Sequence, residues 1–385
     1  MLLSGLNVGV CYLLLPFPSF AMTPNTVTTG VSSTPAPREA WIDWIRAVGS
    51  FGIVALHVVT REKVKRASGI PAFDWWALTT YETAARIAVP LFFMVSGYLC
   101  LRRCAKSEGP SYAWRRGADI LGIVTFWTVI FSFWVMIRAG NTSPWRFLVE
   151  AIQGAPYFHL WFLWALAGIF FVSPLLAPGL SRLSTRQKLV CGCLLPMLVS
   201  LDYAIHCQSG QRFYFRSSVV SMGLPFLAYT CSGYLLGVGV KQGWSRCWLA
   251  IYVFGFVGCL WGYSFLMNQD MPIDERVAFA DKWVFHPFAF PVCMMSIASF
   301  LLISNSQIIA TKKMPPIVAR LARDSMGIYI LHPFVLDTAN WFDLLGRRPN
   351  ALVGVMVVTI VVTLGAWAAT VVIMKIPLLR KTISL

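Results

Sequence analysis

Residues 41–60 have the sequence WIDWIRAVGSFGIVALHVVT, and this stretch decides the fold of the chain. It has the length of about 20 residues that an α-helix needs to cross the hydrocarbon core of a bilayer. Asp43, Arg46 and His57 interrupt the apolar run. A charged residue at the centre of a membrane helix costs about 2.5–3.5 kcal/mol, so such residues usually face the interior of a helical bundle. We therefore expect a membrane helix whose polar side marks a functional site.

The polar residues of this stretch fall on one side of the helix. A helix turns by about 100° per residue, so Arg46 and His57 lie within about 20° of each other. Ser50 shares that face, and Asp43 and Thr60 lie at its margins. About 16 Å along the axis separate Arg46 from His57. The sequence thus predicts an ion pair near one membrane surface and an imidazole deep in the opposite half.

The composition is that of a polytopic membrane protein. Of the 385 residues, 57% are apolar and only 12% are charged, and the mean hydropathy is +0.66. The net charge of +16 comes from short basic clusters between apolar runs. Such clusters set membrane topology and attract anionic lipid headgroups. We therefore predict membrane lipid, and no nucleic acid, as a partner.

The ten cysteines indicate neither disulfides nor a metal site. No CxxC pair occurs, and most of the cysteines lie within apolar runs or basic loops. Cysteines in such places behave as small apolar side chains. We expect no disulfide framework and no bound metal.

Apolar runs after residue 37 predict an all-α, polytopic bundle of about ten transmembrane helices in one domain, residues 38–385. Residues 1–37 form an apolar leader without a basic n-region, followed by a Thr/Ser/Pro-rich linker, and we expect them to lie outside this domain. The ten predicted helices are 41–60, 83–101, 118–137, 157–178, 189–206, 218–240, 247–267, 286–305, 325–343 and 351–374.

Basic residues predict the orientation of these helices. With the N-terminus inside, the inner flanks hold the larger share of the 32 Lys and Arg residues. Cytoplasmic loops show this excess, so we predict that both termini are cytoplasmic. One predicted outer loop, REKVKR at 61–66, breaks the trend.

Two segments echo each other weakly. Ser-Gly-Tyr-Leu occurs at 96–99 after Pro90, and again at 232–235 after Pro225. Gly233 and Gly237 form a GxxxG pattern, which by itself favours close helix packing. The echo therefore does not establish an internal repeat.

Arg86 opens the second predicted helix, one turn before Pro90. Proline removes a backbone donor and kinks a helix, which often marks the wall of a cavity. Arg86 either extends to the lipid headgroups or faces a developing negative charge as a catalytic cation. Both interpretations stay open.

Two further segments place polar or aromatic groups near the membrane interior. His159 and Trp161 begin the fourth predicted helix, either as an interfacial anchor or as part of an acceptor-binding pocket. Tyr329 and His332 share one face of the ninth helix with Ser325. They either join packed helices by hydrogen bonds or bind substrate.

Four motifs resemble one known family. They are IDWIR at 42–46 with His57 eleven residues after Arg46, Arg86 before VPLFFMVSGYL at 89–99, HLWFL at 159–163, and SMGIYILHP at 325–333. In order and content they resemble the acyltransferase-3 family of bacterial integral-membrane O-acyltransferases over about residues 38–375. Within it the likeness is greatest to the branch that acetylates the enterobacterial common antigen.

The resemblance implies an O-acetyltransferase of the bacterial cytoplasmic (inner) membrane. Its donor substrate is acyl-CoA, usually acetyl-CoA, arriving from the cytoplasm, and no cofactor is bound permanently. Its acceptor is a hydroxyl of an extracytoplasmic or lipid-linked glycan. Arg46 and His57 match the family's essential first-helix pair, and Arg86 matches the arginine before its PLFF-SG motif.

The chemistry of acyl transfer gives these residues roles. A sugar hydroxyl is too weak an acid to attack a thioester near neutral pH without a base. His57 either accepts the acyl group as an acyl-imidazole or deprotonates the acceptor. Either Arg86 or a helix-start N–H stabilises the oxyanion. Arg46, oriented by Asp43, binds the phosphorylated end of CoA.

Two other classes of protein fit the same residues. A transporter or flippase also uses intramembrane Asp, Arg and His to move substrate or protons. A non-catalytic scaffold would use buried polar groups only to fix helix packing. Transport without consumption of acyl-CoA would indicate the first, and unchanged acylation after His57→Ala the second.

Overall fold

The computed structural model describes residues 39–65, 72–106, 109–139, 143, 145, 157–208, 223–240, 244–341 and 350–384. Contacts divide the chain into Met1–Arg38 and Glu39–Leu385, and all described residues belong to the second unit. The predicted leader and linker, 1–37, lie outside the described residues. Every regular element in the described part is a helix, which confirms the predicted all-α polytopic bundle.

The helices in chain order are α1 (Ala40–Lys65), α2 (Ala72–Ala85), α3 (Ala88–Ala105), α4 (Gly109–Ala139), α6 (Trp161–Ser181), α7 (Thr185–Gln208), α9 (Phe226–Gly239), α10 (Ser245–Met267), α11 (Ile273–Trp283), α12 (Phe290–Ser304), α13 (Gln307–Thr311), α14 (Pro316–Arg323), α15 (Ser325–Trp341), α16 (Ala351–Met374) and α17 (Pro377–Arg380).

Each of the ten predicted ranges coincides with a described helix, but two of these helices belong to no span that is long and apolar enough to cross a bilayer. Eight described helical spans are long and apolar enough to cross a bilayer. The ranges 218–240 and 325–343 correspond to α9, with 14 residues, and α15, with 17. At 1.5 Å per residue these helices reach about 21 and 26 Å, less than a hydrocarbon core of about 30 Å. Residues 218–222 and 342–343 lie outside the described residues.

The second predicted helix, 83–101, is part of a longer helical span that a turn divides into α2 and α3. The apolar span Phe73–Ala105 covers α2 and α3, and the two helices are separated by a turn at Arg86 and Ile87. Pro90 explains the turn, because a proline ring clashes with the carbonyl four residues earlier, here that of Arg86. Regular bonding resumes when the Leu91 N–H donates to the Ile87 carbonyl, at 3.0 Å. The predicted kink is confirmed, and it places Arg86 at the break.

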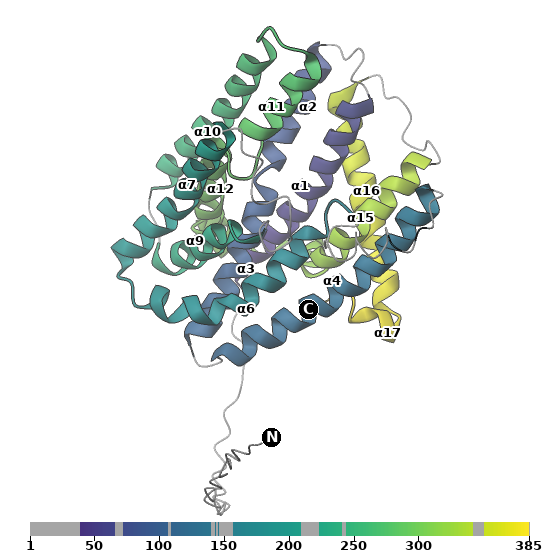
Figure 1. Ribbon diagram of the computed structural model, residues 1–385. Helices are drawn as coiled ribbons and strands as arrows, with labels where there is room; N and C mark the ends of the chain where they lie inside the picture. Colours follow the sequence, from purple (N-terminus) through teal and green to yellow (C-terminus); the bar gives the residue numbers. More distant parts are fainter. Residues whose placement is uncertain are drawn as a thin grey trace, which may run out of the picture. The chain divides into compact units, whose positions relative to one another are not determined.

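Helix α1 lies in the interior of the bundle. It packs against α2, α3, α12, α14, α15 and α16, and Figure 1 shows it between α3 on one side and α15 and α16 on the other. In its most apolar window 61% of residues are buried, against 17% for α10. Its polar stripe therefore faces protein, whereas α10 presents most of its side chains outward.

The two Ser-Gly-Tyr-Leu segments pack against each other. A Cβ atom on Gly97 of α3 would overlap the backbone carbonyl of Thr230, and a Cβ on Gly233 of α9 would overlap that of Met94. Each glycine thus meets the residue three positions before the other glycine, so the crossing is reciprocal. The sequence echo marks a close helix crossing, as the small-residue pattern predicts.

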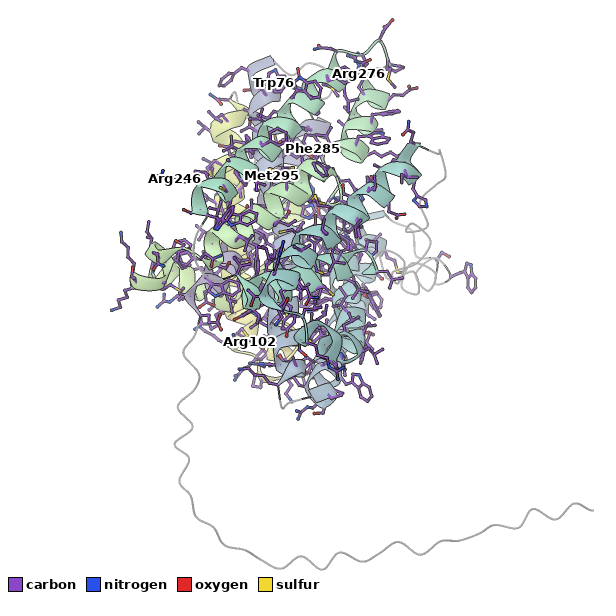
Figure 2. The ribbon with its side chains drawn as sticks, turned by 90° about the vertical axis from the view of Figure 1, so that its left-hand side faces the viewer. Trp76, Arg102, Arg246, Arg276, Phe285 and Met295 are labelled. Atoms are coloured by element: carbon purple, nitrogen blue, oxygen red, sulfur yellow. The ribbon has the colours of Figure 1, made fainter. Side chains whose placement is uncertain are left out.

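Hydrogen bonds and an ion pair join Glu39, the first described residue, to α3. The Glu39 carboxylate accepts hydrogen bonds from Trp41 Nε1, at 2.9 Å, and from the Tyr98 hydroxyl, at 2.8 Å, and it pairs with Arg102. Figure 2 shows Arg102 at the end of the bundle opposite Trp76 and Arg276. Helix α1 therefore begins at the end marked by Arg102.

We predict that Gly233→Ala destabilises the protein. The added methyl group pushes against the α3 backbone, which cannot move as a side chain can, so we expect a loss of about 1–3 kcal/mol. The midpoint of thermal unfolding in detergent measures it. Gly168→Ala is the matched control, since a Cβ there has nothing within 4 Å. Equal midpoints for the two variants would contradict the packing argument.

Candidate active site

Three of the five histidines of the chain meet beside α1. The His57 ring on α1 lies almost parallel to that of His332 on α15, with centroids 5.2 Å apart and 17° between the planes. The His159 ring stands edge-on to His332 at 5.6 Å. His159 and His332 are buried, and His57 is half-buried. This imidazole cluster (His57, His159, His332) is the centre of the candidate site.

Aromatic rings line the imidazole cluster. Phe158 packs on His57, with centroids 4.5 Å apart, and Phe131 of α4 meets His159 edge-on at 4.8 Å. The Tyr329 ring lies 5.4 Å from the His159 ring. Tyr329 and His332 therefore do share a face of α15, as their spacing predicts. The Tyr329 hydroxyl donates a hydrogen bond to the His159 carbonyl oxygen, which holds the cluster's backbone in place.

One buried carboxylate next to the cluster joins three helices. Asp337 of α15 pairs with Arg61 of α1 and, at 2.7 Å, with Arg138 of α4. It also accepts hydrogen bonds from the Tyr157 hydroxyl and from Trp134 Nε1, the latter at 3.0 Å. Its side chain is 0% exposed. A carboxylate with this many donors fixes the end of α15 against α1 and α4.

Tyr157 acts as a hydrogen-bond donor in this network. Burial, together with the Asp337 carboxylate, raises the pKa of Tyr157 to about 12. The phenol therefore stays protonated at neutral pH and donates to Asp337.

Arg86 lies in a separate ionic cluster formed with Lys63, Glu82 and Asp281. Glu82 pairs with Arg86 and, at 2.5 Å, with Lys63, and Asp281 lies 3.3 Å from Arg86. Arg86 also stands 5.3 Å from the ring centroid of Phe285, which Figure 2 labels. Among the described residues, no contact joins the side chains of Arg86 and His57. Two carboxylates therefore balance the cations of this cluster.

Lys63 is enclosed by rings as well as by Glu82. Its Nζ lies 4.9 to 5.4 Å from the ring centroids of Tyr263, Phe285 and Trp75. Cation–π contacts of this kind stabilise a partly desolvated ammonium group. Lys63 thereby joins the end of α1 to α2 and α10.

The segment 61–66 is not an outer loop, as the sequence analysis assumed. Residues 61–65 continue α1, which ends at Lys65, and residue 66 lies outside the described residues. Arg61 and Lys63 carry buried or half-buried charge that Asp337 and Glu82 compensate. These ion pairs explain why the segment departs from the basic-residue trend.

Arg46 and Asp43 lie at the other end of α1, near α14. Asp43 is buried and Arg46 is half-buried. Helix α14 packs against α1, and its Arg320 and Arg323 are exposed. Asp43 and Arg46 therefore lie in one half of α1, and His57 lies in the other half of the same helix.

The other predicted site residues lie outside the cluster. Trp161 packs on Phe226 at 5.2 Å and on Phe93 at 6.4 Å, which places it in the aromatic core between α3 and α9. Within the described residues, no group of His, Cys, Asp and Glu is arranged to hold a metal ion. The three imidazoles therefore do not form a ligand set.

The sequence did not predict three residues of the network beside the cluster, which are Asp337, Arg61 and Tyr157. Asp337 lies in an otherwise apolar helix five residues after His332, and an intramembrane carboxylate is by itself an indication of a site. Arg61 was missed because the end of α1 was placed too early. Tyr157 gave no signal that separates a network residue from an interfacial one.

We predict that Asp337→Asn lowers the thermal stability of the detergent-solubilised protein. Removing one member of a buried ion pair leaves Arg61 and Arg138 uncompensated, at a cost of about 3–5 kcal/mol. Asp202→Asn is the matched control, since that carboxylate pairs with His206 but is 59% exposed. A midpoint unchanged in the Asp337 variant would show that the network does not hold these helices together.

Comparison with known proteins identifies the family. The acyltransferase-3 model, described as an acyltransferase domain, matches residues 39–371. The match contains the whole of α1, the imidazole cluster, the ion pairs of Asp337 and the ionic cluster around Arg86. Comparisons with curated proteins and with solved structures give no match. The chain therefore belongs to the acyltransferase-3 family and is a multi-pass membrane acyltransferase.

Proposed function

We propose that this protein transfers an acetyl group from cytoplasmic acyl-CoA to a hydroxyl of an extracytoplasmic or lipid-linked glycan, in a bacterial inner membrane. The observation that supports the proposal most is the imidazole cluster, in which His57 of α1 stacks on His332 of α15 and His159, in the turn before α6, stands edge-on to His332. The motif likeness to the branch that acetylates the enterobacterial common antigen favours a glycan of that kind.

His57 is the group that we place at the reacting carbon. A thioester is attacked by a hydroxyl only when a base removes the proton, and imidazole suits this near neutral pH. His57 is also the half-buried member of the cluster, so a substrate reaches it more readily than it reaches His159 or His332. It acts either as the acyl carrier or as the base.

The donor is proposed to enter from the Arg46 end of α1. Arginine binds phosphate through its planar fork of donors. The exposed Arg320 and Arg323 of α14 add positive charge near that end. The phosphates of CoA then dock near Arg46 and Asp43, and the pantetheine arm crosses the roughly 16 Å to His57.

Arg86 is proposed to stabilise negative charge from a distance. It is paired with Glu82 and Asp281, and it stands at the break between α2 and α3. A fixed cation beside a water-poor site favours the oxyanion that forms on the thioester oxygen. The ion pairs hold the guanidinium in position without placing it on the substrate.

We predict that His57→Ala abolishes acetyl transfer. Inside-out membrane vesicles receive radiolabelled acetyl-CoA and a total extract of cell-envelope glycolipids, and label in the glycolipid is measured. Loss of the nucleophile or base lowers the rate by at least about 10²–10⁴-fold. A transient, acid-labile label on the wild-type protein would favour the acyl-imidazole.

His286→Ala is the control for this experiment. Desolvation lowers the pKa of His286 to about 3, and its ring stacks on Tyr203 with centroids 4.1 Å apart, so it is a neutral, half-buried imidazole outside the cluster. We expect this variant to retain transfer. Equal rates for wild type and a folded His57→Ala variant would contradict the proposed function, and movement of glycolipid without consumption of acetyl-CoA would favour a flippase.

We predict that Arg46→Lys weakens acyl-CoA binding more than it slows chemistry. Lysine keeps the charge but loses the bidentate fork, so the apparent KM for acetyl-CoA should rise by about tenfold with kcat little changed. Steady-state rates at varied acetyl-CoA measure both constants. Arg116→Lys is the control, at a half-buried arginine 3.8 Å from Asp119 in α4. An unchanged KM in the Arg46 variant would refute the docking role.

A further inference from the structure

We propose that His332 is a second catalytic imidazole, the general base that deprotonates the acceptor hydroxyl while His57 carries the acyl group. This inference rests on the proposed function and goes further, because it assigns the two half-reactions to different helices. The donor half belongs to α1 and the acceptor half to α15.

The hydrogen bonding of His332 leaves one ring nitrogen available. Its Nδ1 lies 2.6 Å from the Tyr329 carbonyl oxygen, and a carbonyl only accepts, so Nδ1 carries the proton. Nε2 then holds the lone pair in the neutral ring. Among the described residues, none forms a hydrogen bond with Nε2, although this atom is buried. The tautomer is therefore fixed, and the basic nitrogen is buried without a hydrogen-bond partner among the described residues.

A buried nitrogen without a partner calls for a ligand. Leaving such a group unsatisfied costs about 1–3 kcal/mol, so it is usually retained for a catalytic or binding role. A hydroxyl group donates the one hydrogen bond that Nε2 lacks. The parallel arrangement of the two rings, 5.2 Å apart, puts that hydroxyl beside an acyl group on His57.

His159 supplies a second unsatisfied imidazole at the same place. His159 is 2% exposed. Among the described residues, neither of its ring nitrogens has a hydrogen-bond partner. The Ile330 carbonyl approaches the ring without the geometry of a hydrogen bond. Tyr329 fixes its backbone. We place the His159 N–H against the acceptor oxygen, where it orients the hydroxyl for transfer to Nε2 of His332.

The second half-reaction needs a base other than His57. Once His57 is acylated, its ring is a weak base and cannot also deprotonate the incoming hydroxyl. In the first step a His57 nitrogen bonds the thioester carbon, the C–S bond breaks, and the CoA thiolate takes the proton that the acylated ring releases. In the second step the hydroxyl gives its proton to His332, the new C–O bond forms and the C–N bond to His57 breaks. The proton then passes from His332 to His57, which restores both rings.

The test compares an acceptor that needs a base with one that does not. Hydroxylamine attacks acyl groups without prior deprotonation, whereas a sugar hydroxyl requires it. We expect His332→Asn to lower acetyl transfer to the glycolipid extract by about 10²–10⁴-fold. We expect the same variant to form acetyl hydroxamate from acetyl-CoA within about twofold of the wild-type rate. Asparagine keeps a donor for the Tyr329 carbonyl, and His332→Gln serves as a second variant.

The controls separate this inference from the proposed function. His57→Ala gives the background and should lose both reactions, and His286→Gln should keep both. Equal loss of both reactions in folded His332 variants would show a structural role and overturn the assignment, as would no loss in either. Wild-type protein that acetylates neither the glycolipid nor hydroxylamine would instead overturn the proposed function, and the role of His332 with it.

Discussion

The structure depends on one constraint: the charged and polar side chains of α1 must be compensated by protein inside a membrane. Arg61 meets Asp337, and Lys63 meets Glu82 and a wall of aromatic rings. The neighbours that supply these partners come from α2, α15 and α10, so satisfying one helix fixes several others. The imidazole cluster differs from these ion pairs, because ring nitrogens of His159 and His332 have no hydrogen-bond partner among the described residues. Under the proposed function, these nitrogens bind substrate.

Helix α15 supplies both the buried carboxylate and one ring of the site. Asp337 is buried in the last described turns of α15, where it pairs with Arg61 and Arg138. The same helix presents Tyr329 and His332 to α1. Helix α9 is shorter still, and its reciprocal glycine crossing with α3 draws the two backbones together. Close packing there keeps the aromatic core beside the site rigid, as small-residue crossings do elsewhere.

Under the proposed function, the binding of a large anionic donor is separated from the chemistry. Arg46 lies in one half of α1 and His57 in the other, so a single continuous helix sets the spacing between them. Two cations near this end of α1, Arg61 and Arg86, are held in ion pairs with Asp337 and Glu82. In the proposed mechanism the thioester reaches His57 along α1 while the acceptor approaches from α15.

The sequence by itself determined what is local to one helix. The 100° turn per residue places Arg46 and His57 on one face, Pro90 dictates the break at Arg86, and Tyr329 and His332 share a side of α15. Only the tertiary structure decided which of these faces meet. It brought His159 and His332 to His57, paired Arg86 with Glu82 and Asp281, and made Asp337 the partner of Arg61. The physical reason is that periodicity depends on neighbours along the chain, whereas contacts between helices depend on packing and charge compensation among residues far apart in it.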